Sequence, residues 1–268
     1  MIQVYIDAEF DAVRYQKRFE QAVISFGAVA CRQKQMLDTF YTLVRPRYFR
    51  HLTPVVKKMT HLKDKEILAA EPLEVVTEHF LSWLQRFGEL ADIQLYSCGP
   101  DDPRTLMKNC AIHHIDGALF DRIQDLQKEI SATVKFQNKI ISPSLSLDDM
   151  KLIYDIQGAV DHNALNDAKD LMYIHQRYLD GNAQNAQRIL DIVNRKEAKQ
   201  QEVRQKQNER LRTMMIQQFQ KYPKEFVKIP LLPEVIEQFQ LWEDRETRTH
   251  MHCCLLYTSD AADDLIGV

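Results

Sequence analysis

The sequence predicts an α/β domain, a β-sheet with helices on both faces, followed by a C-terminal helical extension. Three strand-like apolar segments come first, and strands and helices alternate after them, which is the element order of an α/β sheet. After Gly181 the composition shifts to Gln, Asn, Lys, Arg and Glu, which cannot supply a second core. We therefore predict a domain at residues 1–180, a charged helical extension at 181–250 and a tail at 251–268.

The first three strands are predicted from apolar runs. The run from Ile2 to Asp7 places Val4 and Ile6 on one face. The second strand spans about 22–31 and the third about 37–44. Successive strands of this kind indicate an antiparallel meander.

The helices are predicted from their start and stop signals. Thr53 followed by Pro54 is typical of an N-cap with proline at the first helical position. Pro72 opens a helix whose apolar residues recur at helical spacing until Gly88 ends it. The remaining elements are predicted in this order: a strand at 92–98, a helix at about 103–112, a strand or helix around 120–134, a helix capped by Ser146, and a helix at about 164–179.

The composition indicates a soluble protein of a reducing compartment. The chain has 268 residues, of which 45% are hydrophobic, and a mean hydropathy of −0.40. No run approaches the roughly 20 apolar residues of a membrane helix, and no signal peptide precedes the first strand. The five scattered cysteines do not resemble a disulfide framework. We therefore expect a cytoplasmic location and no membrane partner.

Two acids lie close together on the first strand. Asp7 and Glu9 are two residues apart, so their side chains point to the same face. Carboxylates placed together in this way repel each other and are costly to desolvate unless cations lie between them. The alternative is a solvated strand end, which this pair alone does not exclude.

Two further acids and a histidine follow later in the chain. Asp102 comes after the strand at 92–98 and directly precedes a proline, a position that also suits an N-cap. Asp101 is a second candidate for that cap. Asp167 lies on the first turns of the helix at 164–179, and His162 lies just ahead of it. Taken alone, a histidine such as His162 is more often a surface residue than a catalytic one.

Taken together, these segments resemble the DEDDh branch of the DnaQ-like 3′–5′ exonucleases, whose fold is RNase H-like with a mixed sheet. The resemblance covers about residues 1–180, in the order of the family. Its motifs are Tyr-Ile-Asp-Ala-Glu-Phe at 5–10, Ser-Cys-Gly-Pro-Asp-Asp at 97–102 and His-Asn-Ala-Leu-Asn-Asp-Ala at 162–168. Two departures are Cys98, where the family usually has an aromatic residue, and Phe10, where a small residue or threonine is common.

The resemblance implies a two-metal-ion hydrolysis of phosphodiester bonds. Asp7, Glu9, Asp102 and Asp167 would hold two Mg²⁺ or Mn²⁺ ions, for which carboxylates are suitable ligands. His162 would act as the general base that takes the proton of the attacking water, because an imidazole titrates near neutral pH.

The same resemblance implies the substrate. The 3′ end of a single-stranded nucleic acid would bind with Ala8 and Phe10 of the first motif at its terminal nucleotide. The products would be nucleoside 5′-monophosphates. The net charge of −3 does not oppose this, because metal ions supply positive charge where the phosphate binds. The motifs do not distinguish RNA from DNA. The alternative function is a non-catalytic, nuclease-like module that binds nucleic acid or regulates a partner.

Three other segments have weaker signals. Residues 45–51 interleave cations with aromatics, as single-stranded nucleic-acid grooves do, although a solvated loop fits equally well. Residues 195–212 have a surplus of cations on a solvated helix, and residues 184–220 could serve a protein partner or self-association. The cluster His250, His252, Cys253 and Cys254 has zinc-ligand residue types without a second ligand group of the right spacing. Residues 254–265 resemble a translated sequencing adaptor, so the tail is interpreted as non-native.

Overall fold

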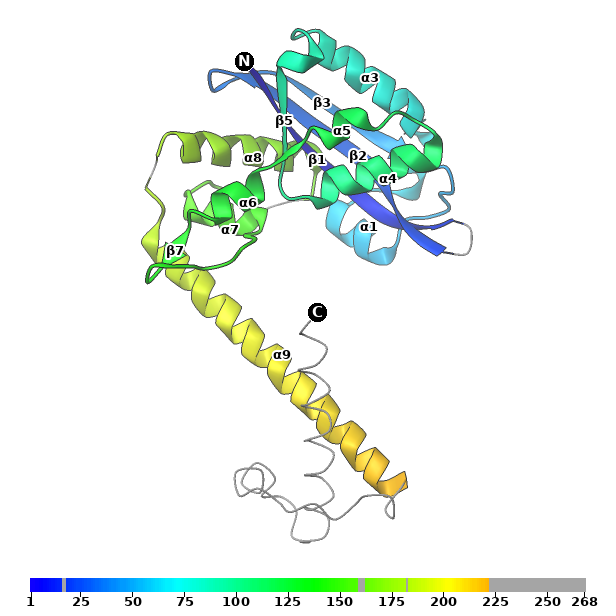
Figure 1. The fold of residues 1–268 in the computed structure, drawn as a ribbon. Coiled ribbons are helices and arrows are strands. Elements are labelled where there is room, and N and C mark those ends of the chain that lie inside the picture. The colour runs from blue at the N-terminus through cyan, green and yellow to red at the C-terminus, as the bar shows by residue number, and fades with distance from the viewer. Residues whose placement is uncertain (16–17, 159–161, 182, 222–268) are drawn as a thin grey trace. The chain divides into compact units, whose positions relative to one another are not determined.

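The computed structural model describes residues 1–15, 18–158, 162–181 and 183–221. Its centre is a six-stranded mixed sheet in the order β4-β3-β2-β1-β5-β6 (Figure 1). Its strands are β1 (Ile2–Tyr15), β2 (Arg18–Arg32), β3 (Gln35–Arg45), β4 (Glu71–Pro72), β5 (Ile93–Ser97) and β6 (Gln124–Asp125). The short pair β7 (Lys135–Phe136) and β8 (Lys139–Ile140) forms a separate hairpin.

The first three strands form the predicted antiparallel meander. The prediction that the first strand ends at Asp7 is wrong, because β1 continues to Tyr15. Beyond a register shift at Glu9/Phe10, the second half of β1 pairs with the start of β2. The apolar pattern stops before this cross-strand pairing does, so the acids Asp7 and Glu9 lie in the middle of a long strand.

The other three strands pair in parallel: β5 with β1, β6 with β5 and β4 with β3. Parallel pairs require crossover connections, which helices provide. The helices are α1 (Pro54–Thr60), α2 (Asp64–Ala69), α3 (Leu73–Gln85), α4 (Asp101–His113), α5 (Ala118–Asp121), α6 (Leu126–Ser131), α7 (Leu147–Ile153), α8 (Ala164–Leu179) and α9 (Ala186–Lys221), with a short 3₁₀ turn at Leu90–Asp92.

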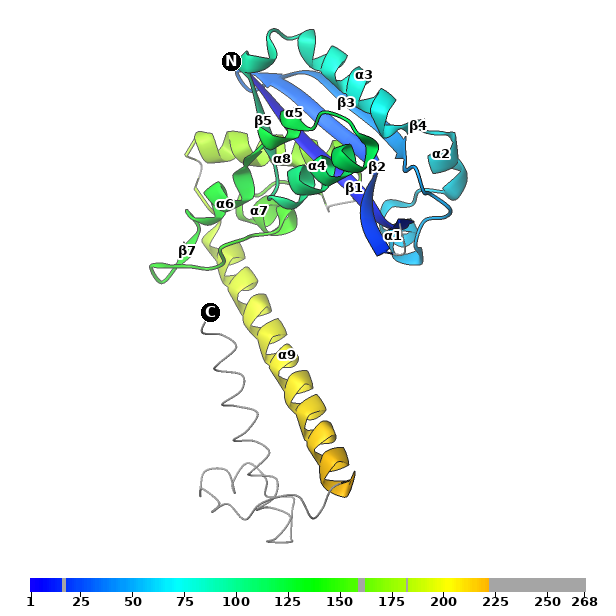
Figure 2. The same cartoon turned by 45° about the vertical axis from the view of Figure 1, so that its right-hand side comes forward.

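Helices cover both faces of the sheet, as predicted (Figures 1 and 2). On one face α3, α4 and α5 pack on the alternate residues Val4, Ile6 and Ala8 of β1. On the other face α6, α7 and α8 pack on Tyr5. The strand alternation that positions these two cores therefore also assigns Asp7 and Glu9 to the α8 side.

The predicted caps are largely as expected. The Thr53 side chain accepts a hydrogen bond from the Val56 N–H, and Pro54 follows at the first helical position. Ser146 caps α7 by accepting from the Asp149 N–H. The last predicted helix of the domain has the same limits as α8, and the Asn163 side chain caps it by accepting from two backbone N–H groups.

The chain divides into two compact units, residues 1–193 and 194–268. The first unit includes the start of α9, where Ile189 and Ile192 are buried in the core on the α8 side. From residue 194 to residue 213 the helix is almost entirely exposed, as its charged composition predicts. No described helix combines the length and the apolar character that a membrane crossing requires. The predicted helix near 235–242, the His/Cys cluster and the adaptor-like tail lie outside the described residues.

Candidate active site

A recess of about 290 Å³ opens beside β1 on the face that α8 covers. Asp7, Ala8 and Glu9 line it from the middle of β1. The backbone that carries the two carboxylates is paired with β2 at Gly27 and Ser25. The pairing of β1 with β5 ends at Tyr5, just ahead of the acids. The carboxylates are partly buried, so they are shielded from bulk water without being enclosed.

Asp102 reaches the same recess from the first turn of α4. The helix begins at Asp101, two residues earlier than predicted, and no side chain caps it. The interpretation of Asp101 or Asp102 as an N-cap is therefore wrong. Instead, the Ala8 backbone N–H donates a hydrogen bond to the Asp102 carboxylate, which ties α4 to the strand of the other acids.

Asp167 is buried in the recess wall, one turn into α8. Its position depends on Gly27, which pairs with Asp7 across β1 and β2. A Cβ at Gly27 would lie 2.3 Å from the Ala164 carbonyl carbon and 2.4 Å from the Leu165 nitrogen. Only glycine lets the start of α8 approach the sheet this closely, and that approach places Asp167 beside Asp7.

His162 lies at the open side of the recess. Its backbone has a positive φ of 52°, a conformation that is uncommon for non-glycine residues and is enriched for Asn, Asp and His. Its side chain is 42% exposed, and its Nδ1 is 3.9 Å from the Glu9 Oε1. Glu9, His162 and Asp167 each offer a ligand atom, and these atoms lie within 4.8 Å of one another.

The carboxylates of the recess disfavour one another's charge. Burial, together with the neighbouring Asp102, Asp167 and Glu9, raises the pKa of Asp7 well above its ordinary value. Burial, followed by the charge of Asp101, raises the pKa of Asp102 to about 7. A cluster of oxygen ligands that resists ionisation without cations becomes favourable when divalent cations bind. The donor set therefore fits Mg²⁺ or Mn²⁺, which prefer carboxylate ligands.

The structure brings together six of the seven predicted site residues: Asp7, Ala8, Glu9, Asp102, His162 and Asp167. Phe10 lies elsewhere, because its side chain packs against the core under α3 and α4. Phe10 directly follows Glu9 on β1, and successive residues of a strand point to opposite faces of the sheet.

The recess also contains residues that the motif analysis does not assign: Cys98, Gln127, Ser146, Leu147 and Asp148. Burial and the surrounding aspartates raise the pKa of the Cys98 thiol, so it remains neutral among the acids. Gln127 is fixed by a hydrogen bond to the Leu145 carbonyl. Ser146 has a sequence signal only as a cap, and Gly27 gives no signal until α8 is placed against it.

The exonuclease family RNase_T matches residues 4–175. The chain therefore belongs to this exonuclease family, and the predicted assignment to the DnaQ-like 3′–5′ exonucleases is confirmed. Exonucleases of this family depend on divalent metal ions. No curated protein matches the sequence significantly.

Solved structures confirm the RNase H-like fold. Cell-death related nuclease 4 (CRN-4) has a TM-score of 0.58 at 22% identity, with 68% of this chain and 64% of that chain covered. The nuclease domain of 3′hExo, a DEDDh family member bound to rAMP, has a TM-score of 0.58 at 19% identity, with coverages of 69% and 96%. A 3′-exonuclease that recognises the histone mRNA stem-loop has 0.57 at 16%, with coverages of 69% and 84%. The chain thus spans less than two thirds of CRN-4, and identities this low establish the fold alone.

Proposed function

We propose that the protein is a 3′–5′ exonuclease that hydrolyses the phosphodiester bonds of single-stranded nucleic acid and releases nucleoside 5′-monophosphates. The observation that carries this proposal is the convergence of four carboxylates and one histidine in a single recess. The carboxylates come from three separate elements, β1, α4 and α8, and the histidine from the residue before the N-cap of α8, within a fold that belongs to an exonuclease family.

Asp7, Glu9, Asp102 and Asp167 would hold two divalent ions. When bound, such ions stabilise the charge that develops on the attacking and leaving oxygens of an in-line displacement. Asp7 has the central position, because Asp102, Asp167 and Glu9 all act on its pKa. The hydrogen bond from Ala8 orients Asp102, and the rigid start of α8 orients Asp167.

His162 has a different role in this proposal. It lies at the open side of the recess, more exposed than the neighbouring Glu9, where an attacking water enters. Its imidazole would accept the proton of that water. His162 directly precedes Asn163, the N-cap of α8.

The direct experiment uses a 5′-labelled single strand of about 12 nucleotides, a length within the usual range of single-strand sites. With Mg²⁺ or Mn²⁺ we expect a ladder that shortens from the 3′ end, and with EDTA we expect intact strand. Matched RNA and DNA strands identify the preferred sugar, since that choice depends on contacts to the 2′-hydroxyl. Endonucleolytic fragments, or binding without turnover, would refute the proposal. The second outcome would favour the non-catalytic module.

We also propose that residues 1–180 contain the whole active site and that residues 181–250 are an extension available to a protein partner or to self-association, mainly through 184–220. Removal of everything after Gly181 would expose the core beneath Ile189 and Ile192. At about 1.5–3 kcal/mol for each buried isoleucine, this truncation costs about 3–6 kcal/mol. A chain ending at Val193 should therefore be active and stable, and a chain ending at Gly181 should be active only where it remains folded. Turnover lost from a folded chain ending at Val193 would show that the extension contributes to the site.

A further inference from the structure

A dense group of cations lies next to the candidate active site. Residues 45–66, which we call the basic platform, comprise the loop after β3, α1 and the start of α2. They contain seven lysines and arginines against Asp64 and Glu66, in a chain whose net charge is −3. The cations are Arg45, Arg47, Arg50, Lys57, Lys58, Lys63 and Lys65. Such a local surplus in an acidic chain is the electrostatic footprint of a polyanion site.

The platform lies on the same face of the sheet as the acids. Glu9 pairs with Ser25, and Ser25 pairs with Leu43, so these three residues form one row across β1, β2 and β3. Residues that are directly paired share a face. Leu43 packs with Leu52, Val56 and other apolar residues of the platform. With strands about 4.8 Å apart, Leu43 lies about 10 Å from Glu9, and the platform packs against Leu43.

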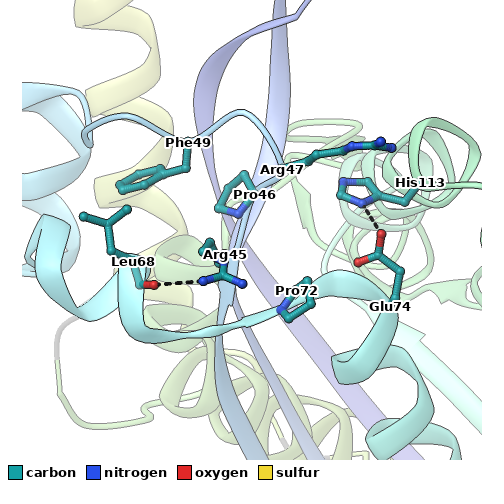
Figure 3. A pocket seen from close by; sticks show the side chains of 8 residues that line it. All are labelled: Arg45, Pro46, Arg47, Phe49, Leu68, Pro72, Glu74 and His113. Carbon is teal, nitrogen blue, oxygen red and sulfur yellow. Dashed lines mark hydrogen bonds and ion pairs between the residues drawn. The ribbon is translucent and has the colours of Figure 1, made fainter.

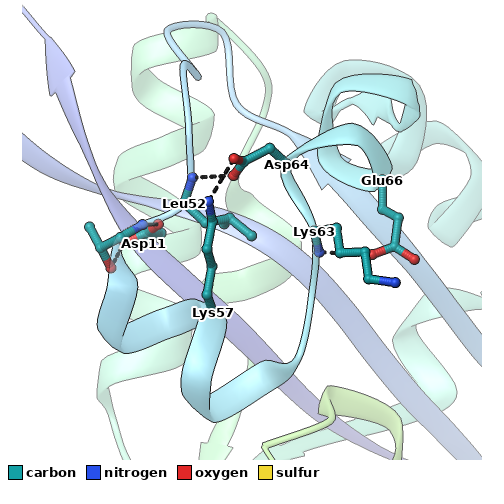
Figure 4. A network of polar contacts seen from close by, with 7 residues as sticks. Asp11, Leu52, Lys57, Lys63, Asp64 and Glu66 are labelled. Atoms are coloured by element: carbon teal, nitrogen blue, oxygen red, sulfur yellow. Dashed lines mark hydrogen bonds and ion pairs between the residues drawn. The ribbon is translucent and has the colours of Figure 1, made fainter.

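Polar contacts fix the platform to the strand of the acids (Figure 4). Asp11 is 2% exposed and lies two residues beyond Glu9 on β1. Its carboxylate accepts hydrogen bonds from the Thr53 N–H at 2.7 Å and from the Thr53 hydroxyl at 2.8 Å. Asp64 accepts from the Leu52 N–H at 2.8 Å and from Lys57 Nζ at 2.6 Å. The start of α1 is therefore held in a defined place relative to the recess.

Most of the platform cations are available for a ligand. Within the described part of the chain, Lys57 is the platform's one cation with an ion pair. Arg47, Arg50, Lys58, Lys63 and Lys65 are exposed. The Arg47 guanidinium lies over the Tyr48 ring, 5.9 Å from its centroid, and this ring is 39% exposed. Cations beside an accessible aromatic face are the features by which proteins hold single strands.

A recess at the N-terminal end of the platform lies between the platform and the helices α3 and α4 of the opposite face (Figure 3). Its volume is about 570 Å³, within the roughly 300–1,000 Å³ of small-ligand pockets. Arg45 and Arg47 line it, together with Glu74 and His113. The Glu74 carboxylate is 2.9 Å from His113 Nδ1, so this acid is already engaged. The two arginines outnumber this one carboxylate, so the recess has an excess of positive charge.

We propose that the basic platform binds the phosphate backbone of the substrate strand on the 5′ side of the nucleotide being removed. This proposal rests on the proposed exonuclease function and specifies how the site holds its substrate. The strand enters the acid recess with its 3′ end, and the flanking phosphates lie on Arg47, Arg50 and Lys58. The occupant is nucleic acid because the exposed charges are positive, several and on the same face of the sheet as the recess that contains the chemistry.

The test compares two triple variants of the full chain in an Asp7→Asn background, in which the strand can bind without being degraded. The platform variant is Arg47→Ala/Arg50→Ala/Lys58→Ala. The matched control is Arg32→Ala/Lys108→Ala/Arg177→Ala, which removes three equally exposed cations outside the platform. Binding of a labelled single strand of about 12 nucleotides is followed by fluorescence anisotropy over a series of salt concentrations. Thermal unfolding of both variants establishes that they remain folded.

For single strands, the slope of log K against log salt changes by about 0.7 for each phosphate contact. Loss of three contacts should therefore make the slope less steep by about 2 in the platform variant, with little change in the control. A dinucleotide, which does not extend to the platform, should bind to both variants alike. The proposal would be overturned by equal slopes for the two variants. It would also be overturned if the platform variant lost as much affinity for the dinucleotide as for the longer strand. The failure of the wild-type protein to degrade any strand would instead refute the proposed exonuclease function, and the slopes would still report on the platform.

Discussion

The two faces of β1 consist of alternate residues of one strand, yet they have opposite chemistry. Val4, Ile6 and Ala8 are 0%, 0% and 6% exposed under α3 and α4. Between them, Asp7 and Glu9 face α8 and are partly exposed in the recess. The apolar face supplies the packing energy that fixes the strand, and the acidic face uses the fixed positions for chemistry. Acids that repel one another can be kept close only on a backbone that the opposite face stabilises.

The largest expected effect comes from the central acid. Asp7→Asn removes the carboxylate that the other acids surround, so turnover should fall by more than about 10⁴-fold, beyond the usual contribution of a general base. Ile6→Val, on the other face of the same strand, is the matched control and should cost about 0.5–1.5 kcal/mol of stability while turnover persists. Turnover and thermal unfolding of both variants measure the contrast. Full activity of Asp7→Asn would refute the metal assignment.

A smaller effect is expected at the open side of the recess. In the proposed mechanism His162 contacts the attacking water and does not ligate metal. His162→Ala should therefore reduce turnover by about 10²–10⁴-fold. Single-turnover kinetics at saturating Mg²⁺ measure the chemical step. Unchanged turnover would make His162 a surface residue without a role in the reaction.

The close approach of α8 to the sheet gives a third prediction. Gly27→Ala forces a Cβ against the backbone at Ala164 and Leu165, so stability should fall by about 1–3 kcal/mol, as is usual for overpacking. Asp167 should shift with the helix, and a misplacement of about 1 Å can cost about 10²-fold in rate. Gly117→Ala is the control on the other face, where the nearest atom lies at 3.3 Å. A Gly27→Ala protein as active as the control would show that α8 does not set the site geometry.

The last prediction concerns the pH dependence of stability in the absence of metal. The pKa of Asp102 rises from 3.8 to about 7 on folding, so the folded protein holds this proton more tightly than the unfolded chain does. The associated stability is present below about pH 4 and is lost as the pH rises through about 7, by up to about 1.4 kcal/mol per pH unit. The unfolding temperature measured in EDTA should therefore fall as the pH rises, and Mg²⁺ should reverse this trend. If Asp102→Asn shows the same pH dependence as wild type, the acid responsible lies elsewhere.

Most of the difference between the two faces of β1 can be predicted from the sequence, because alternation and motif spacing are local properties. The two faces of β1 and the limits of α8 follow from the order of apolar, acidic and capping residues. The six predicted site residues that meet in the recess were assigned through the motif resemblance. Features that depend on tertiary contact do not follow. Gly27 becomes informative only once α8 lies against it. Likewise, the cap assigned to Asp101 or Asp102 was chemically sound, but Ala8 and the neighbouring acids determine where Asp102 points. Phe10, by contrast, continues the alternation of Ile6 and Ala8, so its place in the core could have been predicted from the sequence.

The central claim is that the acidic face of β1 and the acids facing it bind divalent metal, and a calorimetric titration of Mn²⁺ tests it most directly. The wild-type protein and His162→Ala should bind Mn²⁺ with similar affinity, whereas Asp7→Asn and Asp167→Ala should bind it weakly or not at all. The measurement does not depend on substrate or turnover. Mn²⁺ binding that is unchanged in Asp7→Asn and Asp167→Ala, or that is lost in His162→Ala, would contradict the account.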